Sequence, residues 1–288
     1  MDLTSLSVIR YLCDKYGFEF SKTLGQNFLV NAAIPKKTAE GADINGKFVI
    51  EIGPGFGCLT KELCERAKFV AAVEIDRSLL PVLSETLSEF DNLEIINSDI
   101  LDVDIAVLCE KYGYTEAHIC ANLPYYITTP IITKILESSA PVRSVTVMVQ
   151  KELAKRFVSP PGSPDYGAVT AAVMYYTKPK LLFNVSAGSF YPAPKVDSAV
   201  IRLDVIPERE RIAVKNKETF FGVIRSAFAM RRKTLVNNLS AGFSISKSEA
   251  ESILSSLSIP VSVRGETLGI EDFARISDKI EENRSTAR

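Results

Sequence analysis

The chain has 288 residues, of which 46% are hydrophobic, and a formal net charge of −1. This length is sufficient for one large domain and a second small one, each with its own core. No stretch approaches the roughly eighteen consecutive apolar residues of a membrane span, and the first residues lack the pattern of a signal peptide. The sequence therefore predicts a cytoplasmic protein without a membrane partner. Any contact with nucleic acid is expected to come from local basic patches.

The five cysteines and the single histidine argue against several kinds of catalytic site. The cysteines are odd in number and form no C-x-x-C pair, so neither a disulfide framework nor a zinc site is indicated. His118 lies within an expected strand, where we interpret it as structural, and the chain shows no Ser–His or Cys–His couple. No metal is predicted.

The N-terminal segment is expected to contain two helices joined by a polar turn. Residues 3–16 carry apolar side chains at helical spacing, and a second helix is expected to begin near Asn31, a good N-cap. The turn between them precedes the first strand and can fold back over it. Asn27 in this turn could bind a ligand's carboxylate or amino group, or it could only cap the turn.

Residues 48–76 then predict a strand, a glycine turn, a helix and a second strand. The apolar run 48–52 is followed at once by Gly53, Gly55 and Gly57, and such a series of glycines indicates a close approach of the backbone to another group. Glu74 ends the second apolar run about twenty residues after the turn, where a carboxylate can accept hydrogen bonds from a ribose diol. The unit is typical of a nucleoside-binding half-site.

The details of this turn disfavour an NAD-dependent dehydrogenase. The dinucleotide fingerprint G-x-G-x-x-G would need a third glycine where Cys58 stands. No Lys or Arg occurs between Phe48 and Thr60 to help hold a pyrophosphate. Glu51 and Glu74 could instead bracket a cationic nucleoside such as S-adenosylmethionine.

Strands and helices continue to alternate as far as residue 158, as in a parallel sheet. Asp99 ends the third strand, where it could accept a hydrogen bond from an adenine amine or simply begin a turn. The helices are expected near residues 78–90, 104–112, 128–137 and 150–158, and the strands near 93–100, 117–122 and 144–149.

The segment N-L-P-Y-Y that ends the fourth strand is the most specific chemical signal in the sequence. The Asn122 side-chain oxygen and a backbone carbonyl near Leu123 or Pro124 can accept both hydrogens of an aromatic amine. Tyr125 offers a ring on which a base can stack, an interaction worth roughly 1–3 kcal/mol. Phe190, in a later proline-rich crossing between two strands, could meet the base from the opposite face. The alternative is an ordinary turn whose asparagine caps the next helix.

The C-terminal pattern changes to helices. We expect one domain at residues 1–206, which carries the catalytic site, and a helical domain at residues 207–288. Residues 225–238 contain four cations and no acid, which suits an RNA phosphate backbone. The four are Arg225, Arg231, Arg232 and Lys233.

Taken together, these segments resemble the small-subunit (16S) ribosomal RNA adenine dimethyltransferase family, whose relatives include the erythromycin-resistance rRNA methyltransferases. The resemblance spans nearly the whole chain and is carried by seven segments in order. They are LGQNFLVN at 24–31, EIGPGFGCLT at 51–60, EID at 74–76, SDIL at 98–101, NLPYYI at 122–127, FYPAPKVDSAV at 190–200 and RSAFAMRRKTLVNNL at 225–239.

The resemblance implies a Rossmann-like class I methyltransferase fold with a seven-strand sheet and a small helical domain. It implies dimethylation of two adjacent adenosines in the 3′-terminal hairpin loop of small-subunit rRNA, within a pre-ribosomal particle, linked to small-subunit biogenesis. We expect the protein to act as a monomer. It also implies that S-adenosylmethionine is held by the residues at the matching positions. These are Asn27, Leu29, Gly53, Glu74, Asp99 and Asn122, beside Gly55 of the same turn.

Three other functions remain open from the sequence. A ribosome-assembly factor could bind the particle with methylation as a secondary activity. An erythromycin-resistance enzyme would modify large-subunit rRNA, although the C-terminal match favours the small-subunit branch. A DNA adenine methyltransferase would use the same N-L-P-Y arrangement, but about 80 C-terminal residues leave little room for a domain that recognises the DNA sequence.

Overall fold

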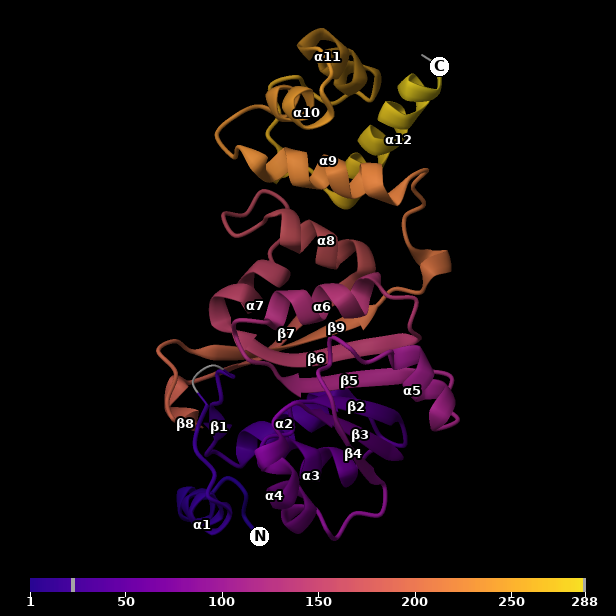
Figure 1. Ribbon diagram of the computed structural model, residues 1–288. Helices are drawn as coiled ribbons and strands as arrows, with labels where there is room; N and C mark the ends of the chain where they lie inside the picture. The colour runs from indigo at the N-terminus through magenta and orange to yellow at the C-terminus, as the bar shows by residue number, and fades with distance from the viewer. Residues whose placement is uncertain (22–23, 287–288) are drawn as a thin grey trace. The chain divides into compact units, whose positions relative to one another are not determined.

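The computed structural model describes residues 1–21 and 24–286, and the chain divides into two compact units (Figure 1). Unit 1 comprises Met1–Ala154 and Pro179–Val205, and unit 2 comprises Lys155–Lys178 and Ile206–Arg288.

The observed division differs from the expected one in residues 155–178, which group with the helical unit. The reason is helix α8 (Ala168–Tyr176), which the sequence analysis did not predict. Its last two residues contact the aromatic rings at the start of helix α9 (Lys217–Ala229): the Tyr175 and Phe220 ring centroids lie 4.7 Å apart, and Tyr176 stacks on Phe221. The segment is therefore bound to the helical unit by ring packing.

Unit 1 contains a seven-stranded sheet in the order β4-β3-β2-β5-β6-β9-β7. The first five strands in this order run parallel, and β9 runs antiparallel to β6. The predicted α/β, Rossmann-like architecture is confirmed. The bounds are β2 Phe48–Ile52, β3 Phe69–Glu74, β4 Leu93–Asn97, β5 Ala117–Asn122, β6 Val142–Gln150, β7 Thr177–Val185 and β9 Ser198–Val205.

Short helices connect the strands of unit 1. Helices α2 and α3 share one apolar cluster with β2, β3 and β5, which includes Leu63, Val49 and Cys120. Since strand residues alternate between faces, Glu51 lies on the same face as Val49. The bounds are α1 Leu6–Tyr16, α2 Ala33–Ala42, α3 Cys58–Cys64, α4 Leu80–Thr86, α5 Ile105–Lys111, α6 Thr128–Glu137 and α7 Lys151–Phe157, of which α7 continues into unit 2.

A separate two-stranded sheet joins the N-terminal loop to the segment before β9. Strand β1 (Phe28–Leu29) pairs antiparallel with β8 (Phe190–Tyr191), and Leu29 lies opposite Phe190. Two residues are too few to show a strand period, which explains why the sequence gives no sign of this pairing.

Unit 2 is helical, as the sequence predicts for the C-terminal region. Helices α8, α10 and α12 pack against α9 around buried aromatic side chains that include Phe220 and Phe273. Tyr166 is fully buried and donates its hydroxyl hydrogen to the carbonyl of Leu268 at 3.0 Å. The remaining bounds are α10 Leu235–Phe243, α11 Lys247–Ser256 and α12 Ile270–Thr286.

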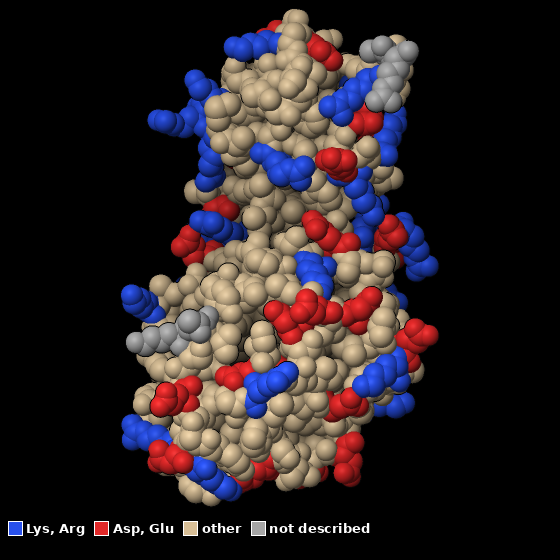
Figure 2. All heavy atoms as spheres, in the orientation of Figure 1, with Lys and Arg blue, Asp and Glu red and all other residues tan. Residues whose placement is uncertain are grey.

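The charges of the surface are mixed. Figure 2 shows Lys and Arg side chains interspersed with Asp and Glu over the visible face of each unit. Within residues 1–21 and 24–286, no helix is both long and apolar enough to cross a membrane. The same residues contain no group of three His, Cys, Asp or Glu side chains that could hold a metal ion.

Candidate active site

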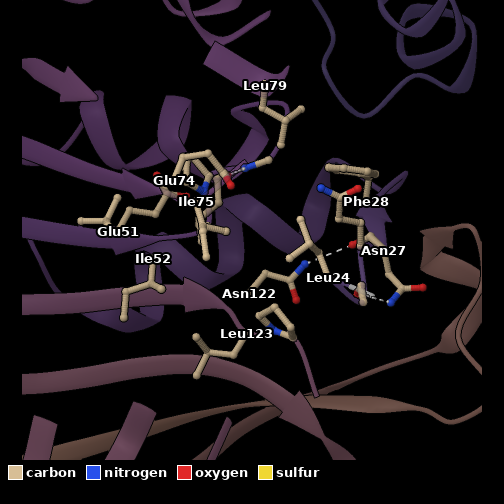
Figure 3. A pocket seen from close by; sticks show the side chains of 18 of the residues that line it. Leu24, Asn27, Phe28, Glu51, Ile52, Glu74, Ile75, Leu79, Asn122 and Leu123 are labelled. Carbon is tan, nitrogen blue, oxygen red and sulfur yellow. Dashed lines mark hydrogen bonds between the residues drawn. The ribbon is translucent and has the colours of Figure 1, made fainter. Parts of the chain in front are cut away.

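One pocket in unit 1 opens where strands β2, β3 and β5 end and β4 passes into its following turn. The volume of the pocket is about 1240 Å³, including the part that is open to solvent. Figure 3 shows Glu74 and Ile75 on one side of this pocket, Leu24, Asn27 and Phe28 on the other, and Asn122 between them. The structure brings together every residue of unit 1 that the sequence predicts for the cofactor or the base. These are Asn27, Leu29, Gly53, Gly55, Glu74, Asp99, Asn122, Leu123, Pro124, Tyr125 and Phe190.

The glycine turn has a backbone that other residues adopt only with strain. Gly53, Gly55 and Gly57 have φ values of 68°, 61° and 90°, in the left-handed region. A Cβ on Gly55 would also lie 2.9 Å from the ring of Phe28. The N-terminal loop thus packs directly on the turn, as the sequence analysis expected, and it can do so only because Gly55 has no side chain.

Glu74 links the end of β3 to this turn. Its carboxylate accepts hydrogen bonds from the backbone N–H of Asp76 at 2.8 Å and of Gly55 at 3.4 Å. The side chain is buried, and this burial raises its pKa. Glu74 therefore fixes the pocket side of the turn and keeps a carboxylate at the pocket wall.

Glu51 lies deeper, and its side chain is only 1% exposed. Among the described residues, no hydrogen bond reaches its Oε2 atom. Burial raises the pKa of Glu51 to about 8, and the nearby carboxylate of Glu74 adds to the effect. A neutral carboxylic acid is thus the form that this position favours at physiological pH.

The pocket is acidic. Among the described residues that line it are Glu74 and Asp99, and none is a Lys or an Arg; Glu51 also lines it but adds no charge in its favoured neutral form. Such a lining attracts a cationic ligand and opposes a pyrophosphate. The lining is therefore compatible with the positively charged nucleoside that the sequence favours over a dinucleotide.

Ile75 belongs to this pocket although the sequence analysis did not select it. It follows Glu74 directly, and its side chain is 51% exposed while it lines the pocket. An exposed isoleucine offers an apolar surface to a flat aromatic base. Its only sequence signal was its position at the carboxyl end of the second strand, next to the acid.

Asn27 caps its own turn and also contacts the N-L-P-Y segment. Its Nδ2 atom donates to the carbonyl of Gly25 at 2.8 Å, and its backbone carbonyl accepts a hydrogen bond from Nδ2 of Asn122 at 3.3 Å. Both sequence-based interpretations thus have support: the side chain stabilises the turn, and the residue lines the pocket. Gln26 ties the same loop to the segment that follows β3, because its Nε2 atom donates to Oδ2 of Asp76 at 2.7 Å.

The N-L-P-Y turn is fixed at three points. The Pro124 carbonyl accepts hydrogen bonds from the Thr128 hydroxyl at 3.0 Å and from the Ile127 N–H at 3.3 Å. The Leu123 N–H donates to the Met148 carbonyl at 3.2 Å. The Tyr125 hydroxyl lies 2.6 Å from the hydroxyl of Ser198. The ring and the carbonyls of this turn therefore have set directions.

Phe190 reaches the pocket through the small β1–β8 sheet. It is only 4% exposed and packs with Leu29, Met148 and Val200. Its position opposite Leu29 in that sheet brings two predicted site residues to one wall of the pocket.

The predicted RNA-contacting cations all lie in unit 2, and the structure distinguishes one of them from the rest. All four are exposed, and Arg231 differs from the others in its contacts. Arg231 donates to the carbonyls of Pro164 at 2.9 Å and Tyr166 at 3.3 Å. Its guanidinium therefore already holds the 160–166 loop of its own unit.

The three prolines and two glycines of residues 159–167 predict a long, flexible loop that borders the site. In the structure it belongs to unit 2, where the N–H of Gly162 donates to the carbonyl of Glu266 at 2.7 Å. Its residues are not among those that line the pocket in unit 1. Contacts distant in sequence therefore hold this loop within unit 2, and its flexibility stays a prediction.

Comparison with known sequences identifies close relatives. A family model described as ribosomal RNA adenine dimethylase matches residues 17–282. The chain is 44% identical over 281 residues to ribosomal RNA small subunit methyltransferase A of Alkaliphilus oremlandii, covering 96% of this chain and 98% of that protein. It is 45% identical over 285 residues to the protein of the same name from Geobacillus thermodenitrificans, covering 97% of each.

Solved structures agree with these matches. A dimethyladenosine transferase from Plasmodium falciparum superimposes with a TM-score of 0.74 at 26% identity, over 90% of this chain and 98% of that one. The 23S rRNA methyltransferase ErmE superimposes with a TM-score of 0.69 at 25% identity, over 88% of this chain and 100% of that one. The class I methyltransferase fold that the sequence implied is confirmed.

Proposed function

This chain belongs to the ribosomal RNA adenine dimethylase family, and from that premise we propose that it transfers methyl groups from S-adenosylmethionine to two adjacent adenosines in the 3′-terminal hairpin loop of small-subunit rRNA. Each target adenosine receives two methyl groups on its exocyclic nitrogen. The single observation that carries the proposal is the pocket in unit 1, where the acid-lined glycine turn and the N-L-P-Y turn share one space.

The cofactor half of the pocket is formed by the ends of β2, β3 and β4. S-adenosylmethionine supplies an electrophilic methyl carbon on a positively charged sulfur. Glu74 accepts hydrogen bonds from the ribose hydroxyls, and Asp99 accepts one from the adenine amine. Ile75 covers one face of the adenine. Gly53 and Gly55 let the backbone approach the ligand, and Asn27 and Leu29 close the pocket from the N-terminal side.

The substrate half is formed by the N-L-P-Y turn. Both lone pairs of the Pro124 carbonyl are already used by Thr128 and Ile127, so the second acceptor that we assign is the Leu123 carbonyl. Asn122 Oδ1 and this carbonyl accept the two hydrogens of the adenine amine. They favour a pyramidal nitrogen whose lone pair points at the methyl carbon.

The target base is held between two rings. Tyr125 stacks on one face, with its hydroxyl fixed by Ser198, and Phe190 supports the opposite face. The nitrogen would take the methyl carbon as the carbon–sulfur bond breaks, leaving the neutral thioether S-adenosylhomocysteine. No strong general base is needed, because the methylated nitrogen carries a positive charge and releases its proton to water. Asn122, Leu123, Pro124, Tyr125 and Phe190 thus act by position alone.

The RNA is held by exposed cations of unit 2. Arg225, Arg232 and Lys233 contact phosphates, whereas Arg231 contributes mainly by ordering the 160–166 loop. Because the chain has a net charge of −1, we propose that the substrate is a partly assembled small-subunit particle, which the protein binds as a monomer in the cytoplasm during small-subunit biogenesis.

The test is to incubate the protein and methyl-labelled cofactor with small-subunit particles that lack the modification, and to map the labelled nucleotides. We expect N6,N6-dimethyladenosine at two adjacent positions near the 3′ end. Large-subunit particles and naked small-subunit rRNA serve as controls. Label found only in large-subunit rRNA would contradict the proposal, and equal labelling of naked rRNA would contradict the requirement for a particle.

A further inference from the structure

The ammonium group of Lys134, on helix α6, lies against three backbone carbonyls of one turn. It donates to Ile100 and Val103, each at 3.1 Å, and to Leu101. A lysine ammonium has three N–H donors, and all three are directed at this turn. The Lys134 side chain is partly buried, so these charged hydrogen bonds are less weakened by water than those of an exposed lysine.

The turn that Lys134 holds also carries Asp99. Ser98, Asp99 and Ile100 line the pocket. The carboxylate of Asp99 accepts a hydrogen bond from the N–H of Leu101 at 2.8 Å. Leu101 is therefore bound at both ends of its backbone, by Asp99 through its N–H and by Lys134 through its carbonyl. Leu101 thus links the Asp99 carboxylate to the Lys134 ammonium.

Helix α6 connects this turn to the substrate half of the site. It begins at Thr128, three residues after Tyr125 of the N-L-P-Y segment, and the Thr128 hydroxyl donates to the Pro124 carbonyl at 3.0 Å. The apolar face of α6 is buried through Ile131 and Ile135, which fixes the helix. A short, rigid path thus runs from the turn that receives the target base to the turn that receives the cofactor's adenine.

We propose that Lys134 is a positioning residue that sets the Asp99 carboxylate for recognition of the cofactor's adenine amine. The inference rests on the proposed function, because it takes the ligand of the Asp99 turn to be the adenine of S-adenosylmethionine. Without the ammonium, three carbonyls lose their charged donor, and the turn relaxes away from the geometry in which Asp99 accepts that amine.

The test compares two ligands that differ at the exocyclic group of the base, which is the group that Asp99 is proposed to bind. S-adenosylhomocysteine carries the exocyclic amine, whereas S-inosylhomocysteine carries an oxygen at the same position. Calorimetry of the full-length wild-type protein is expected to show a clear preference for the adenine ligand. In Lys134→Met, the affinity for the adenine ligand should fall by about tenfold or more, while that for the inosine ligand changes much less.

A lysine with a merely structural role would give a different result. Lys134→Met would then lower the affinity for both ligands by the same factor and leave the adenine preference unchanged. This result would overturn the inference. The inference also predicts that Lys134→Met adds little further loss of adenine preference in an Asp99→Ala background. If the wild-type protein binds neither ligand, both the inference and the proposed function fail. If Lys134→Met keeps the adenine preference, only the inference fails.

Two further variants keep the result interpretable. Lys111→Met is the matched control. Lys111 pairs at 2.7 Å with Glu94 of β4, the strand that leads into the Asp99 turn, but Lys111 is not among the residues that line the pocket. It should leave the preference unchanged. If Lys134→Met does not fold, Lys134→Arg keeps the positive charge and several N–H donors, and it should show a smaller loss of preference in the same direction.

Discussion

The side-chain amide of Asn122 donates from Nδ2 to the backbone carbonyl of Asn27, across 95 positions of sequence, at 3.3 Å. An amide whose nitrogen is held in this way has its oxygen, Oδ1, directed elsewhere. Since Asn122 lines the pocket, the contact leaves Oδ1 free to accept a hydrogen from the amine that we propose as the substrate. The N-terminal loop therefore does more than close the pocket, because its backbone determines which end of the Asn122 amide is presented.

Tyr125 has two features that can be tested separately: its aromatic ring, and its hydroxyl group, which contacts Ser198. Tyr125→Leu removes the ring and should raise the particle KM or lower kcat by about tenfold to a hundredfold, because stacking of one base is worth roughly 1–3 kcal/mol. Tyr125→Phe keeps the ring but loses the hydroxyl contact, and should lose only a few-fold. Steady-state methylation of particles measures both. Equal losses in the two variants would show that the hydroxyl, rather than the ring, is what matters.

Gly55→Ala should disturb both stability and cofactor binding. The added Cβ would lie 2.9 Å from the Phe28 ring, in a backbone with φ of 61°. We expect a loss of about 2–3 kcal/mol in the free energy of unfolding, from backbone strain and the forced shift of Phe28 together. Urea unfolding measures the loss, and calorimetry with the cofactor measures the weakened binding.

Gly46→Ala is the control for this experiment. Gly46 has a similar φ of 67°, but a Cβ there would meet nothing within 4 Å. It should show only the strain, of about 1 kcal/mol, and unchanged cofactor affinity. If the two variants lose equal stability, the close packing of Phe28 on the glycine turn is not the cause.

Glu51 should make the stability of the ligand-free protein depend on pH. Its folded-state pKa of about 8 is above its value of about 4.5 in the unfolded chain, so its contribution is fully present below pH 4.5 and is lost as pH rises through 8. Glu51→Gln cannot ionise. The unfolding free energy of the variant relative to the wild type should therefore increase between pH 5 and pH 8.5, by an amount on the order of a few kcal/mol.

Urea unfolding of both proteins at a series of pH values measures this difference. Comparing the two proteins at each pH cancels the titration of all other groups, and a constant cost of the buried amide would not change with pH. A difference that stays flat between pH 5 and pH 8.5 would show that Glu51 is ionised in the folded protein throughout this range.

Arg232 and Lys233 should contribute to the salt dependence of particle binding. Replacing both with Gln is expected to reduce the slope of log affinity against log salt concentration by about 2, because each lost phosphate contact removes about 1. Filter binding at several salt concentrations measures the slope. Arg231→Gln is the comparison: it should leave the slope nearly unchanged and lower the stability of unit 2, because Arg231 holds Pro164 and Tyr166. A larger slope change in Arg231→Gln would reverse these roles.

The site was predictable from sequence where the signal is local. The glycine turn and the N-L-P-Y turn each follow a buried strand, and the carboxyl ends of parallel strands meet at one edge of a sheet. Their convergence on one pocket therefore followed once the strands were assigned. The acid at the end of each strand followed from the same rule, and the pocket contains both Glu74 and Asp99.

The features that the sequence did not reveal depend on contacts between distant residues. The β1–β8 pairing joins segments more than 150 residues apart, and neither strand is long enough to show a period. Lys134 in an amphipathic helix is indistinguishable from a solvated charge until the three carbonyls beside it are seen. Arg231 appeared equivalent to Arg232 for the same reason.

Single-turnover methylation by Asn122→Ala, measured beside its cofactor affinity, tests the central claim most directly. The claim is that one pocket positions an adenine amine against the cofactor's methyl carbon through Asn122. We predict that the variant binds the cofactor within a few-fold of the wild type in calorimetry, while the rate of methyl transfer to pre-bound small-subunit particles falls at least a hundredfold. A near-normal transfer rate in Asn122→Ala would contradict the account.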